Sequence, residues 1–367
     1  MSLLHRIALT SIKDIGPVLA KNLLAYFGDE EAIFKAGKAK LLTVPGIGEK
    51  TIAQLDFDDA LRKAETELKF IEKNDIDVLF YTDSKYPKRL KNCHDSPILL
   101  YSKGNADLNM YHVISVVGTR NGTEYGKTLC RQLVEELKPY NVLIVSGLAH
   151  GIDVAAHKEC LKAGVPTVGV LGHGLDRIYP AGNRDTAAKM VQNGGLLTEY
   201  PSGTVADREN FPQRNRIVAG IADATIVVEA SVKGGALITA EIANSYNRDV
   251  FAFPGRVGDT YSEGCNFIIR NNKAALLTCA ADVAYTLGWE KPDDAKPAKE
   301  QQFLLPIDLS PEEQTIYNII NQHNQPLAID DLTVKTNMPM SQLAMNLLNM
   351  EMQGYIRSLP GKMYKVN

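Results

Sequence analysis

Short apolar runs alternate with helical patterns between residues 113 and 287, and this alternation restricts the fold more than any other feature of the chain. Val113–Val117, Val142–Ser146 and Thr167–Leu171 lack the polar alternation of a half-exposed strand, so they are typical of strands buried on both faces of a parallel sheet. Helical patterns over Tyr125–Lys138 and Asp153–Ala163 separate these strands. This order predicts an α/β domain with an extended Rossmann-like, doubly wound and mostly parallel sheet.

Further strands of the same domain are expected at Gly195–Thr198, Ala224–Glu229 and Val250–Phe253. Upstream, Val78–Tyr81 predicts a short strand. The segment Ser96–Gly104 contains Pro97, and because proline cannot donate a hydrogen bond to a central ladder, we expect this segment at the edge of the sheet.

The first buried strand is followed by a glycine-rich turn that predicts an anion site. Gly118, Gly122 and Gly126 recur at every fourth residue before a helix begins, and glycine lets backbone amides approach a phosphate at a helix N-terminus. Thr119 and Arg120 lie inside this turn. Because an open α/β sheet binds ligands at the carboxyl ends of its strands, we expect Arg120 to contact the anion.

The turn after the second strand offers two more points of close backbone approach, Gly147 and Gly151. Asp153 and His157 follow at the i, i+4 spacing of a metal-ligand pair. No third ligand follows at a useful spacing, so a helix cap and a hydrogen-bonded histidine are favoured over a metal site.

The loop after the third strand, residues 171–184, is long and polar, as functional loops on a rigid scaffold often are. Tyr179 is a candidate to stack on a base, and Arg184 is a candidate to bind a phosphate. The alternative is a surface loop that is closed by packing of Tyr179 and Pro180.

The sequence NFPQRNR at residues 210–216 is the strongest signal for a binding site. Phe211 offers an aromatic face, Arg214 and Arg216 offer bidentate donors for phosphate, and Asn215 adds an amide between them. The alternative is that the two arginines form ion pairs with nearby acidic residues, namely Glu199, Asp207 or Glu209.

A second glycine-rich segment precedes another helix. Lys233, Gly234 and Gly235 form a candidate anion nest, and Thr239 adds a hydroxyl group. Glu241 is either an acid–base residue or a solvated carboxylate that the helix dipole stabilises. Arg256 follows the strand expected at residues 250–253 and reaches the same edge of the sheet.

The 367-residue chain has a net charge of −3, so it lacks the overall basic charge that is typical of nucleic-acid-binding proteins. Any binding of nucleic acid must therefore depend on a local cluster of basic residues. The glycine turns and arginines form such a cluster, because they gather at one edge of the sheet. A single nucleotide phosphate does not need so many donors, whereas the successive phosphates of a strand do. Few residues are suited to read base edges, which favours binding that is independent of sequence.

The five cysteines are widely spaced and include no CxxC pair, which indicates a reducing compartment and no zinc ribbon. No apolar run approaches the roughly 20 residues of a membrane span, and the N-terminus lacks the pattern of a secretory signal. We therefore expect a cytoplasmic protein that does not contact a membrane.

Smaller modules are predicted on both sides of the α/β domain. Residues 1–70 contain a weak internal repeat, at residues 12–20 and 42–53, whose second copy has the glycine spacing of a helix-hairpin-helix. Its glycines and Lys50 could meet a DNA phosphate, or the module could serve packing alone. Residues 71–289 form the α/β domain, and residues 290–308 are a linker rich in proline and charge.

Residues 309–367 predict a winged helix, with helices over 310–323, 329–336 and 341–354 and a hairpin over 355–364. Ser310 and Glu313 have capping-box spacing at the first helix. The third helix carries no lysine or arginine, so we expect it to bind protein rather than the major groove of a duplex.

Six motifs in order make the chain resemble the DprA/Smf family of bacterial DNA-processing proteins of natural transformation. These are VVGTR at 116–120, VSGLAHGID at 145–153, VLGHGLDRIYPAGN at 170–183, NFPQRNRIVAG at 210–220, VVEASVKGGALITA at 227–240 and DVFAFPG at 249–255. One departure is Ala181, where the family often has a basic residue, and Arg184 is the candidate replacement.

The resemblance implies a protein without catalytic residues, metal or cofactor, which binds single-stranded DNA in the Rossmann domain. It also implies a homodimer formed through that domain and a role in loading the recombinase RecA onto incoming DNA. A competing hypothesis is an enzyme, because KGGALITAE loosely resembles the PGGxGTxxE motif of nucleotide phosphoribohydrolases, with Glu241 as the acid–base residue. A dinucleotide-dependent enzyme is excluded by the absence of GxGxxG from the first turn.

Overall fold

The structure of the chain is a computed structural model that describes residues 3–290, 309–323, 326–359 and 361–366. The chain divides into two compact units, Met1–Ala280 and Ala281–Asn367. Apart from Glu290, the predicted linker 290–308 lies outside the described residues.

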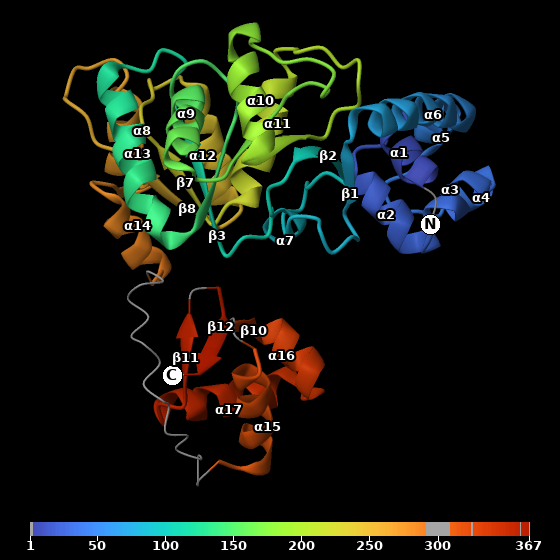
Figure 1. The fold of residues 1–367 in the computed structure, drawn as a ribbon. Coiled ribbons are helices and arrows are strands. Elements are labelled where there is room, and N and C mark those ends of the chain that lie inside the picture. Colours follow the sequence, from blue (N-terminus) through green and yellow to red (C-terminus); the bar gives the residue numbers. More distant parts are fainter. Residues whose placement is uncertain (1–2, 291–308, 324–325, 360, 367) are drawn as a thin grey trace. The chain divides into compact units, whose positions relative to one another are not determined.

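The described part of the first unit is built around a nine-stranded sheet in the order β1-β2-β6-β5-β4-β3-β7-β8-β9 (Figure 1). The strands are β1 (Asp77–Phe80), β2 (Leu99–Gly104), β3 (His112–Val117), β4 (Val142–Ser146), β5 (Thr167–Val170), β6 (Gly194–Thr198), β7 (Ala224–Val227), β8 (Asp249–Ala252) and β9 (Ala275–Leu276). Strands β3 to β9 pair in parallel, whereas β1 and β2 pair antiparallel at one side. The predicted α/β class with a mostly parallel sheet is confirmed.

Helices cover both faces of this sheet. They are α8 (Glu124–Leu137), α9 (Ile152–Ala163), α10 (Arg184–Gln192), α11 (Asn210–Ile221), α12 (Gly235–Ser245) and α13 (Glu263–Arg270), and α14 (Ala280–Leu287) begins at the boundary with the second unit. Helices α9 and α11 both pack on β3, β4 and β5, while α9 also packs with α8 and α10, and α11 packs with α12. The central strand β3 is buried at all six residues, as its β-branched sequence predicts.

The direction in which strands are added reverses at β3. The chain continues from β3 to β4 on one side, and later returns to place β7 on the other side. In an open parallel sheet, such a reversal separates the loops that follow the two neighbouring strands and opens a crevice at their carboxyl ends. The fold therefore places the expected ligand site after β3 and β7.

The expectation of an edge strand at residues 96–104 is wrong. Strand β2 lies between β1 and β6 and forms antiparallel ladders with both. Pro97 precedes the first residue of β2, so the missing amide hydrogen of proline does not interrupt either ladder. The position of proline thus limited where the strand begins, and it did not determine the position of the strand in the sheet.

The N-terminal helices pack as a module beside β1 and β2 (Figure 1). They are α1 (Leu3–Ser11), α2 (Pro17–Phe27), α3 (Glu30–Lys35), α4 (Lys38–Leu41), α5 (Glu49–Gln54) and α6 (Phe57–Asn74), and a short helix α7 (Lys88–Lys91) follows β1. Gly46 has a φ of +89° and packs against Leu19 on α2, so the turn of the second repeat contacts the helix of the first. The hydrophobic core of the module includes Phe80, Leu99 and Tyr101 from the sheet.

The second unit contains the predicted winged helix. Its elements are α15 (Pro311–Asn321), β10 (Leu327–Ala328), α16 (Ile329–Thr336), α17 (Met340–Met352), β11 (Ile356–Leu359) and β12 (Met363–Val366). The capping box at α15 is present, because Ser310 and Glu313 each accept the backbone N–H of the other. Among the helices that the structure describes, none has the length and apolar character that a membrane span requires.

Candidate nucleic-acid interface

A pocket of about 800 Å³ lies at the carboxyl ends of β3, β4 and β7, where the sheet topology predicts a ligand site. It brings together most of the residues that the sequence singled out, namely Gly118, Thr119, Arg120, Gly147, Tyr179, Phe211, Arg214, Asn215, Gly234, Gly235 and Thr239. These residues come from five separate loops and helix starts. The sequence motifs therefore converge on one site.

The turn after β3 is held from two sides. The Thr119 N–H donates to the Glu229 carbonyl at 2.7 Å, and the Ile152 N–H donates to the Thr119 carbonyl at 3.1 Å. The Glu229 carboxylate is buried and accepts both the backbone N–H and the hydroxyl of Thr123. Arg120, which is exposed, thus projects from a turn whose backbone is fixed by neighbouring strand ends.

Two glycines let separate segments come close beside this turn. A Cβ on Gly151, which has a φ of +78°, would lie 2.1 Å from the Thr119 carbonyl oxygen. A Cβ on Gly147 would lie 2.3 Å from both Arg214 Nη1 and Asp153 Oδ2. Gly151 therefore lies directly against the turn of Arg120 without lining the pocket, and Gly147 leaves room for a charged pair.

Arg214 is a buried cation at the base of the pocket, with 5% of its surface exposed. Its Nη1 donates to the Val170 carbonyl at 2.5 Å, and its charge faces Asp153. Burial raises the pKa of the Asp153 carboxyl, although the Arg214 guanidinium opposes this change. Burial likewise lowers the pKa of Arg214. The N-cap of α9 is Gly151, with no side-chain hydrogen bond, so Asp153 is not the helix cap that the sequence predicts.

An aromatic and cationic stack forms one wall of the pocket. The Arg120 guanidinium carbon lies 5.5 Å from the centroid of the Phe211 ring, within the range of a cation–π interaction. Tyr179 lies on the same ring at a centroid distance of 6.0 Å and an interplanar angle of 36°. Tyr179 is 51% exposed, so about half of its surface is open to solvent. An exposed aromatic ring can stack on an unpaired base of any identity.

Helix α12 begins at the opposite wall. Gly234 is its N-cap and offers no side-chain hydrogen bond, so the first amides of the helix remain available to a ligand. Gly234, Gly235 and the buried Thr239 all line the pocket. Uncapped amides and the helix dipole favour an anion at this position.

The pocket carries an excess of positive charge. Arg120, Arg208 and Arg214 line it, against the single carboxylate of Asp153 among the described lining residues. Arg208 was missed by the sequence analysis, although it stands two residues before the NFPQRNR motif. Its closeness in sequence to that motif could have identified it as a pocket residue. The sequence predicts no helix over the motif, however, so it does not show which side chains face the same way.

The other predicted residues lie outside this pocket. Arg184 is the exposed first residue of α10, and Lys233 is exposed in the turn before α12. Arg256 lines a neighbouring pocket of about 990 Å³ together with Tyr125 and Tyr261. Glu241, the acid–base candidate, forms an ion pair with Lys273 at 2.9 Å and does not line the main pocket.

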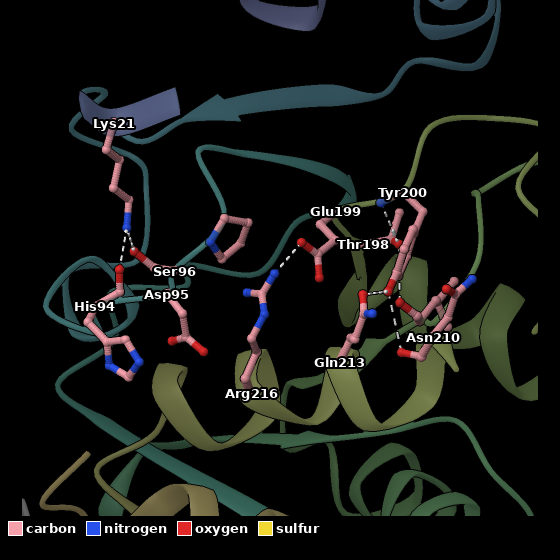
Figure 2. Close-up of polar contacts among 12 residues, drawn as sticks. Lys21, His94, Asp95, Ser96, Thr198, Glu199, Tyr200, Asn210, Gln213 and Arg216 are labelled. Atoms are coloured by element: carbon pink, nitrogen blue, oxygen red, sulfur yellow. Dashed lines mark hydrogen bonds and ion pairs between the residues drawn. The ribbon is translucent and has the colours of Figure 1, made fainter. Parts of the chain in front are cut away.

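Arg216 also lies away from the main pocket. It forms an ion pair with Glu199, and both side chains are 14% exposed (Figure 2). Two residues on a helix are about 200° apart, so Arg214 and Arg216 leave α11 in different directions. The ion pair with Glu199 is one of the alternatives that the sequence left open.

His157 on α9 holds the loop that contains Gly147 by a side-chain hydrogen bond. Its Nε2 donates to the Gly147 carbonyl at 2.5 Å, and its Nδ1 lies 2.7 Å from the Thr167 hydroxyl oxygen. The imidazole is fully buried, and this burial lowers its pKa to about 4. Across the described residues, no group of three or more potential metal ligands is found.

The low pKa of His157 predicts a loss of stability in weak acid. The unfolded chain takes up a proton near pH 6.5, whereas the folded protein resists it until about pH 4. The contribution is therefore complete above pH 6.5 and decreases by about 3 kcal/mol as the pH falls to 4. Urea unfolding of the wild type and of His157→Gln at several pH values measures it. A difference between the two proteins that does not change from pH 7 to pH 4.5 would contradict the prediction.

The sheet, its switch-point pocket and the two flanking modules define an extended Rossmann-like protein with helix-hairpin-helix and winged-helix modules. Family comparisons agree with this class: residues 77–288 match DNA recombination-mediator protein A, residues 297–362 match the DprA winged helix domain, and residues 7–55 match a SAM-like helix-hairpin-helix tandem. The chain belongs to the DprA/Smf family.

Individual relatives cover most of the chain. Protein Smf of Synechocystis is 32% identical over 98% of this chain and 97% of its own length, and DNA processing protein DprA of Bacillus subtilis is 35% identical over 66% and 84%. The X-ray structure of DprA from Streptococcus pneumoniae matches 78% of this chain and 98% of its own, with a TM-score of 0.67 and 31% identity. DNA processing protein A from Helicobacter pylori, whose structure describes its single-stranded DNA binding mode, matches 59% of this chain and 97% of its own with a TM-score of 0.53 and 28% identity.

Proposed function

We propose that the pocket binds single-stranded DNA through its backbone, independently of sequence. The observation that carries this proposal is the contact of the exposed Arg120 and Tyr179 with the Phe211 ring, in the pocket that the uncapped start of α12 also lines. Arginine and helix amides suit phosphates, and the aromatic faces suit unpaired bases. The single-stranded DNA binding mode described for the Helicobacter pylori relative supports the same ligand class.

The wider role that we propose is protection of incoming DNA and loading of RecA during natural transformation and homologous recombination. The family description, DNA recombination-mediator protein A, supports a mediator role. We also propose a homodimer formed through the Rossmann domain. Strand β9 ends the sheet, and Leu276 on it is 50% exposed, which supports a surface that a second copy would cover.

We propose that the site acts without catalysis. The competing phosphoribohydrolase hypothesis requires Glu241 to face a bound nucleotide. In the structure its carboxylate pairs with Lys273 on the outer side of α12, and the pocket carboxylate of Asp153 is buried beside Arg214. This arrangement supports binding over acid–base chemistry. Release of a base from a nucleoside monophosphate that disappears in Glu241→Ala would overturn it.

Replacement of Arg120 by alanine tests the proposed ligand. We expect the affinity for a labelled oligothymidylate to fall about tenfold or more, because a charge-assisted contact is lost. The slope of log K against log salt should decrease by about 0.7, the value for one phosphate contact on a single strand. Fluorescence anisotropy over a series of salt concentrations measures both quantities.

The matched control is Arg62→Ala, which removes an arginine whose side chain is 74% exposed on α6. It should bind as the wild type does. A duplex of equal length should compete weakly, because paired bases cannot stack on Tyr179. Wild-type affinity in Arg120→Ala, or equal affinity for the duplex, would show that this pocket does not bind single strands.

A further inference from the structure

Helix α11 has two functional faces. Phe211 and Arg214 face the pocket, whereas Gln213 and Arg216 face the end of β6 (Figure 2). There the Tyr200 hydroxyl lies 3.3 Å from Gln213 Oε1, and Glu199 forms the ion pair with Arg216. Glu199 and Tyr200, which follow β6, thus contact α11 on the side that faces away from the pocket, here called the back of α11.

The loop 199–209 joins β6 to α11 and also carries Arg208 of the pocket. A residue of the N-terminal module holds this loop. Both carboxylate oxygens of Glu67, on α6, accept the Ser202 N–H at 2.9 and 3.0 Å, and one of them also accepts the Ser202 hydroxyl at 2.5 Å. Glu67 is 5% exposed, so water does not compete well for these hydrogen bonds.

The module also reaches the back of α11 near Glu199. A cavity of about 180 Å³ is lined by Gly16 and Pro17 of the module, by Pro97, and by Glu199 and Tyr200. Beside it, Lys21 Nζ on α2 donates to Ser96 Oγ at 2.6 Å (Figure 2). The module therefore contacts two segments near α11. Glu67 holds loop 199–209, which precedes α11, and Lys21 contacts His94 and Ser96, on the side of α11 that carries Arg216 (Figure 2).

We propose that the N-terminal module sets the affinity of the pocket for single-stranded DNA by positioning loop 199–209 and helix α11, with Glu67 and the Glu199–Arg216 pair as the positioning residues. The proposal rests on the proposed function of the pocket. Arg216 acts through Glu199 on the back of α11 and makes no contact with the nucleic acid.

Positioning and contact have different signatures in salt. A residue that contacts a phosphate contributes to the salt slope, because its binding releases counterions, and removal of one contact lowers the slope by about 0.7. A residue that positions others changes the affinity and leaves the slope as it was. The salt slope therefore separates the two roles of Arg216.

The test uses the full chain with the substitutions Glu67→Ala and Arg216→Met, and with Glu72→Ala as the control on the exposed side of α6. We expect the first two to weaken binding of labelled oligothymidylate by about tenfold, since hydrogen bonds that order the binding loop are lost, with an unchanged salt slope. The control should bind as the wild type does. A slope that falls by about 0.7 in Arg216→Met, or wild-type affinity in Glu67→Ala, would overturn the proposal.

A second comparison separates positioning from misfolding. The double substitution Glu199→Met with Arg216→Met removes both buried charges, so it should bind more tightly than Arg216→Met alone, in which Glu199 is left without its partner. If Arg216 contacted DNA, removal of Glu199 could not restore the affinity, and the double variant would bind as weakly as Arg216→Met.

Hydrogen exchange without DNA keeps this proposal distinct from the proposed function. In Glu67→Ala we expect faster exchange of the amides in 199–209, while helices α1 and α2 keep their protection. A wild-type protein that binds no single-stranded DNA would overturn the proposed function. The exchange rates of residues 199–209 would still show whether Glu67 of the N-terminal module orders this loop. Unchanged exchange in 199–209 would overturn the positioning role itself.

Discussion

Substitution of Arg214 by methionine is expected to abolish binding of single-stranded DNA and to lower the free energy of unfolding by about 3–5 kcal/mol. The guanidinium is 5% exposed and is the charge that faces the buried carboxylate of Asp153. Removal of the Arg214 guanidinium leaves the Asp153 carboxylate buried without a compensating charge. The pocket also loses the cation at its base. Urea unfolding and anisotropy with oligothymidylate measure the two effects.

The two effects separate when Asp153→Asn is added to the same chain. The carboxylate is then replaced by a neutral amide of similar size, so most of the stability should return. The affinity for DNA should stay low, because the cation is still absent. A double variant that recovers both stability and binding would mean that Arg214 only supports the fold.

The same substitution should make stability depend on pH with a defined sign. Without Arg214, burial raises the pKa of Asp153 with less opposition than in the wild type. A carboxyl group whose folded pKa lies above its unfolded value of about 3.9 stabilises the fold least at high pH. The stability deficit of Arg214→Met should therefore be larger at pH 7 than at pH 5.

Substitution of Gly151 by alanine is the second change for which we expect a large effect. A residue other than glycine at this backbone conformation costs about 1–3 kcal/mol before any contact is considered. The new Cβ would also lie 2.1 Å from the Thr119 carbonyl oxygen and 2.5 Å from the carbonyl group of Arg120, so the turn must move. Thermal unfolding and DNA affinity should both decrease, because displacement of the turn carries Arg120 away from Phe211.

Gly164 provides a control without a clash. Its φ of +74° is close to the +78° of Gly151, but its ψ is +17° where Gly151 has −127°, and a Cβ at Gly164 would meet no atom within 4 Å. Gly164→Ala should therefore show the cost of alanine in a left-handed turn and keep the affinity for DNA. Equal loss of affinity in both variants would indicate that the clash with the turn has no part in the effect.

Much of the fold could be predicted because the central strands are mostly apolar runs, rich in β-branched residues and followed by glycine-containing loops. Thr167–Val170 and Val142–Ser146 are buried at all their residues, as such runs predict. The order of the strands could not be predicted, since periodicity reports burial and not which strand is the neighbour. The interior position of β2 is one consequence.

The glycine turns and arginines of the candidate site could be identified, because each follows a strand and strand ends share one edge of a parallel sheet. The directions of the side chains could not. The NFPQRNR segment has Pro212 in its first turn and mixed polar residues, and it was not assigned as a helix. Without that helix, nothing in the sequence distinguishes Arg214, which faces the pocket, from Arg216, which faces Glu199.

The hydrophobic core around Phe80, Leu99 and Tyr101 has a consequence for how the chain folds. These side chains belong to strands of the sheet, yet they pack with Ile7, Leu9 and other side chains of the N-terminal helices. Part of the apolar surface of the helices is therefore covered only when β1 and β2 are in place, which couples the folding of these strands to that of the helices. During synthesis, the core of the N-terminal module is complete only after residue 101 has been made.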